Sequence, residues 1–583
     1  MPALLRLACL ALVLPLAACV ALAEPPASES DADAAEAAHA QAAPPAPEHD
    51  AKRLPAQELT EPLLYELLLA EIALQRGDAA LAAKTYLELA RRTRDPRVAR
   101  RAAEVASNAR APQLALEAAR IWHDAEPESM QALQTLTALL VRGRRVEEAE
   151  PYLATLLARD GAATGNGFLQ LARLLAGNAD KQANLRLVER LAARYPQLAP
   201  AHLAVAQAAL AAEDESKALA QTRRARELQP DWEAAAIYEA QILQRKDPGA
   251  AARSLVAFLE QQPRARDARL AYARLLVGER RLAEARVQFE ALLAGFPDDG
   301  ELRYAVGLLA MQLRDFATAE AAFMRLLDAG FRDPSGVRFL LGQAAEEQRK
   351  WAEALDWYGS IERGENALPA RLRTAGVMAK QGRLEEAREY LRKVDASEEQ
   401  RVQVLVTEAH LLREANQLSE AYELLDGALA RQPDQPELLY DHALTAEKLE
   451  RYDVLEASLR KLIRLKPDHA HAYNALGYSF ADRNLHLPEA RKLIERALEL
   501  MPEDYYIVDS MGWVLYRMGD LKGALEHLQR AYAGRPDAEI GAHLGEVLWK
   551  LGRHDEAGRV WDEALKQFPE NETLRKTLKR LRP

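Results

Sequence analysis

Residues 505–536, YYIVDSMGWVLYRMGDLKGALEHLQRAYAGRP, and residues 538–569, AEIGAHLGEVLWKLGRHDEAGRVWDEALKQFP, are two copies of one pattern. The repeated positions are Gly512, Ala524, Leu528, Ala531 and Pro536 in the first copy, and Gly545, Ala557, Trp561, Ala564 and Pro569 in the second. The same spacing recurs from Ala409 to Pro433 and from Ala206 to Pro230, and from Ala273 to Pro297 with one larger residue. A fixed period of about 34 residues indicates a repeat architecture.

The spacing predicts two helices and a tight turn in each repeat. The first small residue lets the two helices approach closely, and the second faces the next repeat along one stripe of the second helix. Turn signals fall between the helices, as in Gly77-Asp78, Gly382-Arg383, Gly519-Asp520 and Gly552-Arg553. The proline ends the second helix because it has no N–H to donate. The periodic positions are therefore structural.

These residues resemble the tetratricopeptide repeat family. Bulky side chains fill the expected slot on the second helix at Tyr86, Phe289, Phe323, Tyr358 and Trp561. The resemblance implies an all-α, right-handed superhelical solenoid. It predicts degenerate helical hairpins over 58–197, a regular array over 198–569 and a polar cap helix over 570–583. Irregular segments at 161–167, 330–336 and 362–366 are candidate hinges or joints.

Composition limits the functional classes. The net charge is −11, which argues against nucleic acid, because binding it depends on clustered Lys and Arg. A local basic run, Arg91 to Arg101, is interpreted as a solvated helix face, with a docking patch for an acidic partner or lipid headgroups as the alternative. Both cysteines, Cys9 and Cys19, lie in the first twenty residues, so the rest of the chain has no disulfide or thiol nucleophile.

The N-terminus has the layout of an export signal. Arg6 precedes a short apolar stretch that ends in Leu16-Ala17-Ala18-Cys19. This resembles the lipobox of bacterial lipoproteins, which implies a signal peptide at 1–18 and a lipidated Cys19. Val20 after the cysteine implies the outer membrane, facing the periplasm. Ala21-Leu22-Ala23 is the rival, a cleavage site that would release a soluble protein. Residues 19–57 are rich in Pro, Ala and acid, and are predicted to be a disordered tether.

No catalytic motif is recognisable. The chain has no Gly-rich phosphate loop with Lys-Ser/Thr, no G-x-S-x-G and no H-E-x-x-H. The nearest metal-like sequence is Asp468-His469-Ala-His471, whose histidines diverge by about 200° on a helix. Asp468 fits better as a helix N-cap. We expect no catalytic residue, no metal and no cofactor, and not an enzyme.

The resemblance to the repeat family also predicts where partners bind. It implies a concave face made by the first helix of each repeat, at positions three before the first small residue and one, four and five after it. Tyr, Trp and Arg are common interface anchors, although packing between repeats is an equally open reading for the aromatic residues. In the last three repeats the predicted groove residues at these positions are Asn474, Tyr478, Asp509, Trp513, Tyr516, Arg517, Glu546, Trp549 and Lys550, and His471 and Tyr506 are added because they lie one turn earlier on the same faces.

The whole layout, with a lipobox, a tether and a long array, resembles proteobacterial outer-membrane lipoproteins that carry such repeats. One kind is the adaptor of a periplasmic carboxyl-terminal processing protease, which brings it peptidoglycan hydrolases as substrates; the segment Ser510-Met-Gly-Trp-Val-Leu-Tyr516 adds to this likeness. The resemblance implies a protein-binding scaffold. Two alternatives stay open: an assembly or export factor for envelope polysaccharide or outer-membrane proteins, and, more remotely, a cell-wall enzyme.

Overall fold

The structure, a computed structural model, describes residues 55, 58–159, 164–176 and 179–581. Over these residues the chain is built from helices α3 to α33, without a strand. None of the described helices is long and apolar enough to cross a membrane. The expected signal peptide, and all of the expected tether except Pro55, lie outside the described residues.

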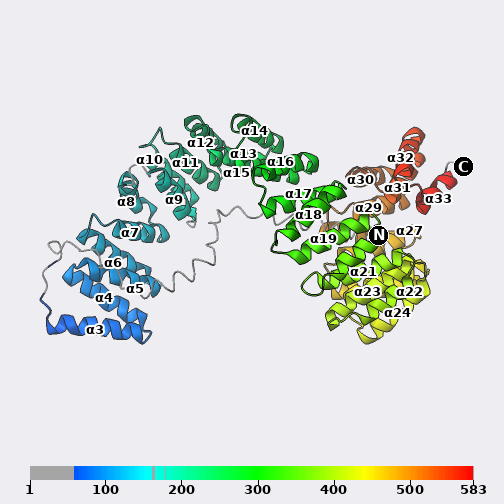
Figure 1. Cartoon of the computed structure of the whole chain (residues 1–583), viewed down its shortest axis with the longest axis horizontal. Coiled ribbons are helices and arrows are strands. Elements are labelled where there is room, and N and C mark those ends of the chain that lie inside the picture. Colours follow the sequence, from blue (N-terminus) through cyan, green and yellow to red (C-terminus); the bar gives the residue numbers. More distant parts are fainter. Residues whose placement is uncertain (1–54, 56–57, 160–163, 177–178, 582–583) are drawn as a thin grey trace. The chain divides into compact units, whose positions relative to one another are not determined.

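The chain divides into two compact units, and the first runs to Asp315. Figure 1 shows its helices in blue to green, stacked as antiparallel pairs. They are α3 (Glu61–Gln75), α4 (Ala79–Thr93), α5 (Pro96–Asn108), α6 (Pro112–Ala125), α7 (Met130–Arg142), α8 (Val146–Arg159), α9 (Thr164–Ala176), α10 (Lys181–Ala192), α11 (Ala199–Ala211), α12 (Glu215–Leu228), α13 (Glu233–Gln244), α14 (Pro248–Gln261), α15 (Arg266–Gly278), α16 (Leu282–Gly295) and α17 (Gly300–Gln312).

The second unit begins at Phe316, before the irregular segment at 330–336. It continues the same arrangement to the C-terminal end (Figure 1). Its helices are α18 (Phe316–Asp328), α19 (Pro334–Glu347), α20 (Trp351–Gly359), α21 (Ala367–Lys380), α22 (Leu384–Lys393), α23 (Glu398–Glu414), α24 (Leu418–Arg431), α25 (Pro436–Lys448), α26 (Tyr452–Leu465), α27 (Ala470–Asp482), α28 (Leu487–Leu500), α29 (Tyr505–Arg517), α30 (Leu521–Gly534), α31 (Ala538–Lys550), α32 (His554–Gln567) and α33 (Glu572–Leu581).

The small residues act as the spacing predicts. At Gly545 of α31, a Cβ would lie only 2.0 Å from Trp561 Nε1 of α32, and at Gly512 of α29 only 2.5 Å from Leu528 Cγ of α30. In these two repeats the bulky side chain of the second helix, Trp561 or Leu528, therefore occupies space that is free only because the facing residue is glycine. Trp561 is fully buried, as are Ala557 and the corresponding alanines of the other repeats. The all-α hairpin array predicted from the sequence is confirmed.

The ends of the hairpin helices are also where the sequence places them. The turn glycine between α29 and α30, Gly519, has φ 89°, a left-handed conformation that favours glycine. Other hairpins fill this slot with a non-glycine residue, such as Arg144, Arg280 or Asn416, at φ 57–60°. Each predicted terminal proline follows a second helix closely: α30 ends at Gly534 before Pro536.

One local interpretation changes, and the interpretation of the basic run as a solvated helix face is kept over its alternative. Asp468 does not cap α27; the N-cap is His469, whose Nδ1 accepts from the backbone N–H of Ala472 at 3.1 Å. The helix therefore begins one residue later than a cap at Asp468 would place it. The basic run is not a free cationic patch, because most of its arginines pair with carboxylates of the same or adjacent helices. These pairs are Arg91 with Glu88 and Glu117, Arg92 with Glu66, Arg97 with Asp95, Arg100 with Glu104, and Arg101 with Glu71 and Glu104.

Candidate partner-binding surface

The predicted groove residues all lie on three consecutive first helices, α27, α29 and α31, which pack on one another in order. Their exposure differs widely. Asp509, Trp513 and Glu546 are buried, at 3 to 6% exposed, and only Lys550 is largely exposed. The others are half-buried: His471, Asn474, Tyr478, Tyr506, Tyr516, Arg517 and Trp549.

A cluster of three buried side chains joins α29 to α31, and we call it the His543 cluster: Asp509, Trp513 and His543. Both carboxylate oxygens of Asp509 lie 3.0 Å from His543 Nδ1. The Trp513 ring stacks on the imidazole with 4.1 Å between centroids and 21° between planes. Trp513 Nε1 has no hydrogen-bond partner, so stacking and burial hold the indole in place. The sequence did not single out His543, because it lies two residues before the small position Gly545 and outside the family's groove positions.

Charge stabilises this cluster. Burial alone would lower the pKa of His543, but the attraction and hydrogen bond of Asp509 outweigh it and hold the pKa above the ordinary value of 6.5. Glu539 and Glu546 act in the same direction. Asp509 therefore favours the protonated form of the imidazole inside the helix packing. Such a pair fixes the register of two helices rather than reacting with a substrate.

A second buried carboxylate ties in the last helix. The Tyr516 hydroxyl of α29 donates to Glu546 Oε1 of α31 at 2.9 Å, and Arg580 of α33 donates to Glu546 Oε2 at 2.5 Å. Burial, with the nearby carboxylate, raises the pKa of Tyr516 to about 12, so the phenol stays protonated as the donor. Asp509, Trp513, Tyr516 and Glu546 thus pack between first helices, which is the packing alternative that the sequence left open.

The remaining predicted residues form the accessible part of the surface. Arg517 lies over the Trp513 ring, 5.7 Å from its centroid, and neither Arg517 nor Lys550 forms an ion pair within the residues described. The two cations occupy the same repeat position, five residues after Gly512 and Gly545. The edge of Trp549 contacts His554, with 4.1 Å between centroids. Arg517, which lies over a buried ring, and the exposed Lys550 are the charged groups that this surface offers, and arginine is a common anchor of protein interfaces.

Buried glutamates elsewhere carry the same structural role. In two distant repeats the glutamate directly before the small residue is bound by two arginines of the preceding second helix. Glu239 accepts hydrogen bonds from Arg223, at 3.1 Å, and from Arg226. Glu408 accepts hydrogen bonds from Arg388 and Arg392, both at 3.1 Å. Paired carboxylates of this kind are not free to act as a general acid or base.

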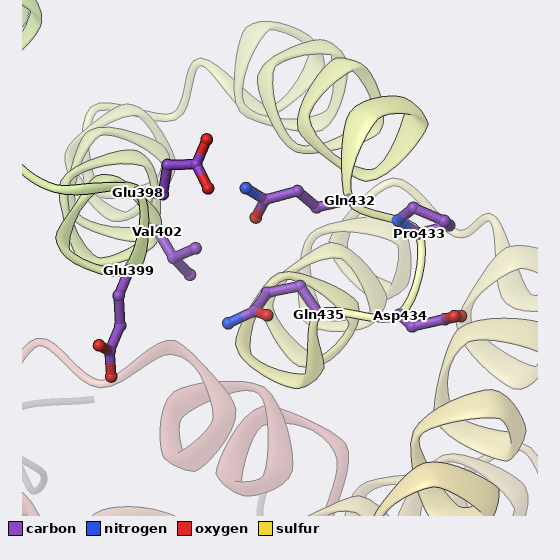
Figure 2. Close-up of a pocket in the computed structure, with 7 residues that line it drawn as sticks. All are labelled: Glu398, Glu399, Val402, Gln432, Pro433, Asp434 and Gln435. Atoms are coloured by element: carbon purple, nitrogen blue, oxygen red, sulfur yellow. The ribbon is translucent and has the colours of Figure 1, made fainter.

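A shallow hollow of about 390 Å³ lies away from the predicted surface, where the start of α23 meets the loop between α24 and α25. Figure 2 shows the amides of Gln432 and Gln435 directed toward the α23 side, where Glu398 and Val402 stand, while Asp434 points away. Glu399 and Pro433 complete the lining. Across the described part of the chain, no group of three or more His, Cys, Asp or Glu is arranged to hold a metal.

Comparison with known proteins identifies the repeats. Family models described as tetratricopeptide repeat match residues 243–300, 304–367, 440–505 and 510–572, and a further model of the same description matches 378–447. A TPR repeat-containing protein of Pseudomonas aeruginosa is 34% identical over 556 residues, which cover 90% of this chain and 88% of that protein. The chain belongs to the tetratricopeptide repeat family.

Two further similarities cover smaller parts of this tetratricopeptide repeat protein. Cellulose synthase operon protein C of Pseudomonas fluorescens is 28% identical over 325 residues, covering 47% of this chain and 23% of that protein. A solved thermophilic TPR protein of Thermus thermophilus is 25% identical, covers 31% of this chain and 98% of its own, and has a TM-score of 0.29. Tetratricopeptide arrays are protein-interaction scaffolds, and this fold is typical of proteins without a catalytic site.

Proposed function

We propose that the chain is an outer-membrane-anchored adaptor, held by a lipid on Cys19, whose first-helix surface binds protein partners in the periplasm. The partners we propose are a carboxyl-terminal processing protease and its substrates, including peptidoglycan hydrolases. The anchor rests on the Leu16-Ala17-Ala18-Cys19 sequence. Holding two proteins on one tethered array raises their effective concentration for each other without any chemistry in the array.

The observation that carries the proposal is the construction of the α27, α29 and α31 surface. The buried charges below it, in the His543 cluster and around Glu546, are paired within the array. Arg517 and Lys550 stand at one repeat position on successive first helices, α29 and α31, and neither forms an ion pair with another described residue. A surface that is rigid underneath and has free charges on top supports binding rather than catalysis.

The decisive test is co-purification of the full-length protein from envelope extracts, followed by mass spectrometry. The variant Arg517→Ala with Lys550→Ala should lower recovery of the bound protease about tenfold, the equivalent of ~1.4 kcal/mol. Its matched control is Lys522→Ala with Arg559→Ala, which removes one Lys and one Arg from the exposed sides of α30 and α32. Equal recovery with both variants would remove the first-helix surface as the binding site.

The anchor has a separate test. Cys19→Ser should move the protein from the membrane fraction to the soluble fraction, since lipid chains on one residue supply the attachment. Persistence in the membrane fraction would overturn the lipid anchor. A mature N-terminus after Ala23 instead of at Cys19 would favour the soluble periplasmic alternative.

A second candidate function is an assembly or export factor for envelope polysaccharide. Its support is the similarity over 325 residues to cellulose synthase operon protein C. The co-purification separates the two: a polysaccharide synthase or export component among the partners, with no protease, favours the second candidate. A cell-wall enzyme would degrade peptidoglycan without any partner, and incubation of the purified protein with peptidoglycan detects it.

A further inference from the structure

The first described helix, α3, presents an apolar face to solvent. Its sequence, EPLLYELLLAEIALQ, is apolar on all sides, a composition typical of a helix that is covered all round. Only Ala70 and Ala73 are buried, on the side that packs against α4. On the opposite side Leu64, Tyr65, Leu67, Leu68 and Ile72 are 37 to 66% exposed.

These side chains form one continuous face. Leu64, Leu68 and Ile72 are four residues apart, so they follow one ridge along the helix. Tyr65 and Leu67 flank this ridge, and Leu59, 72% exposed, lies just before the helix. Together they leave roughly 500–600 Å² of apolar surface in water, the upper end of what a monomer exposes. We call this surface the α3 face.

The charges around the α3 face disfavour a lipid surface as its occupant. Helices that lie on membranes carry Lys and Arg on their polar side. The charged residues of α3 are all acidic, and two of them are already engaged: Glu66 with Arg92, and Glu71 with Tyr86 and Arg101. Nothing on α3 would attract anionic headgroups.

We propose that the α3 face is the interface of a homodimer, in which α3 of a second copy packs antiparallel on it. The ridge is symmetric about Leu68. A twofold axis through Leu68 places Leu68 against its counterpart and Leu64 against Ile72 of the other copy. Such an isologous contact is closed and self-complementary. Polar residues at Glu61 and Gln75 form its rim. Two such faces would bury roughly 1,000–1,200 Å² in total, which reaches the ~1,000 Å² expected of a biological interface and is smaller than a standard one.

Cysteine cross-linking of the full-length chain in envelope preparations tests this. The native cysteines are Cys9 and Cys19, so the parent chain, which keeps both, gives the background of cross-linking against which a new thiol is measured. Leu68→Cys should give a disulfide-linked band of twice the chain mass under mild oxidation. The control, Val287→Cys on α16, places a thiol at a similarly exposed apolar position of the same unit. We expect at least fivefold more dimer with Leu68→Cys than with Val287→Cys.

A second pair of variants tests the direction of packing. Chains with Leu64→Cys and chains with Ile72→Cys, produced together, should be joined by a short thiol cross-linker more efficiently than either alone. The proposal is overturned if Leu68→Cys gives no more dimer than Val287→Cys. That result is expected if residues before 55 of the same chain cover α3. A cross-linked band that contains a different protein also overturns it. Better cross-linking of Leu64→Cys with itself overturns the antiparallel arrangement.

Discussion

The two ends of the repeat array differ in how the terminal helix faces solvent. At the C-terminal end, α33 covers α31: Leu574 is fully buried, and Arg580 reaches the buried carboxylate of Glu546. The outer side of α33 is charged, with Lys576 paired to Glu572 at 3.1 Å in open solvent. At the N-terminal end of the described chain, α3 shows leucine, isoleucine and tyrosine to solvent.

The difference shows that a terminal helix does not have to be a cap. Repeat arrays need a polar outer face at their ends for solubility, and α33 meets that need with charge. Because the outer side of α3 is apolar, this helix meets the same need only when another surface covers it. The C-terminal end is therefore stabilised by contacts within the described chain, whereas the N-terminal end is the place where we propose that a second copy packs.

The largest expected effect is at the C-terminal end. Trp561→Ala removes a fully buried indole from the gap beside Gly545 and should lower the free energy of unfolding of the last hairpins by about 3–5 kcal/mol. Hydrogen exchange of amides in α31 and α32 is the measurement, because long arrays unfold in parts. Unchanged protection there would show that the C-terminal end is no more tightly packed than the N-terminal end.

A smaller effect follows from the His543 cluster. The pKa of His543 is higher in the folded chain than the unfolded value of 6.5. Its contribution to the free energy of unfolding is therefore fully present below pH 6.5 and is lost as the pH rises through the folded pKa. Stability of α29–α31 should fall by up to about 1.4 kcal/mol per pH unit in that window. Asp509→Asn should abolish this slope, because the carboxylate that raises the pKa of His543 is gone. Below pH 6.5 the variant should lose about 1–3 kcal/mol of stability, and the loss stays in this range because the imidazole can release its proton.

A titration of amide protection in α29–α31 measures this slope. The matched control is His527→Gln, because burial lowers the pKa of that half-buried histidine of α30. Its contribution has the opposite sign and is lost as the pH falls, so His527→Gln should leave the decline above pH 6.5 unchanged. A decline that survives Asp509→Asn would contradict the role of the pair.

Removal of the cap contact should have a modest effect. Arg580→Ala leaves Glu546 with the Tyr516 hydroxyl as its remaining partner, and the Arg580 side chain is 57% exposed. We expect a loss of about 1 kcal/mol or less, seen as faster amide exchange in α33. Lys579→Ala on the same helix serves as the control. Equal exchange in the two variants would mean that apolar packing alone holds α33.

The smallest effect is expected at the N-terminal end. Leu68→Lys changes an exposed side chain and should alter the stability of the isolated chain by no more than ~0.5 kcal/mol. The same substitution should prevent cross-linking through Ile72→Cys and Leu64→Cys. A large loss of helical content with Leu68→Lys would show that α3 is buried within its own chain, and the contrast between the two ends would disappear.

Most of the fold follows from the sequence because the repeat is periodic. Gly545, Trp561 and Pro569 have fixed spacing, and each has one steric reason, so hairpin packing and helix ends could be predicted. The cap at His469 could not, because Asp468 satisfies the same local preference one residue earlier, and only the backbone conformation decides between them.

The candidate surface could be predicted less completely. The repeat positions place the candidate residues on α27, α29 and α31, but they do not tell which of these side chains are accessible. Trp513 and Asp509 are buried because His543 fills the space beside them, and that contact joins residues 34 apart in sequence. Arg580 reaches Glu546 from a helix outside the periodic pattern. Neither partner has a signal in the repeat spacing. Binding at Arg517 and Lys550 stays a prediction.

The arginine pairs on Glu239 and Glu408 have a consequence for how such a chain changes over generations. Among the described residues, each of these buried carboxylates pairs with arginines of the second helix of the preceding hairpin. Excising α21 and α22 would keep the repeat count in phase, yet it would strip Glu408 of both cations and leave a bare charge in the core. Hairpins of this array are therefore ordered neighbours rather than interchangeable modules, and duplication or loss of a hairpin is tolerated only where no such pair crosses the joint.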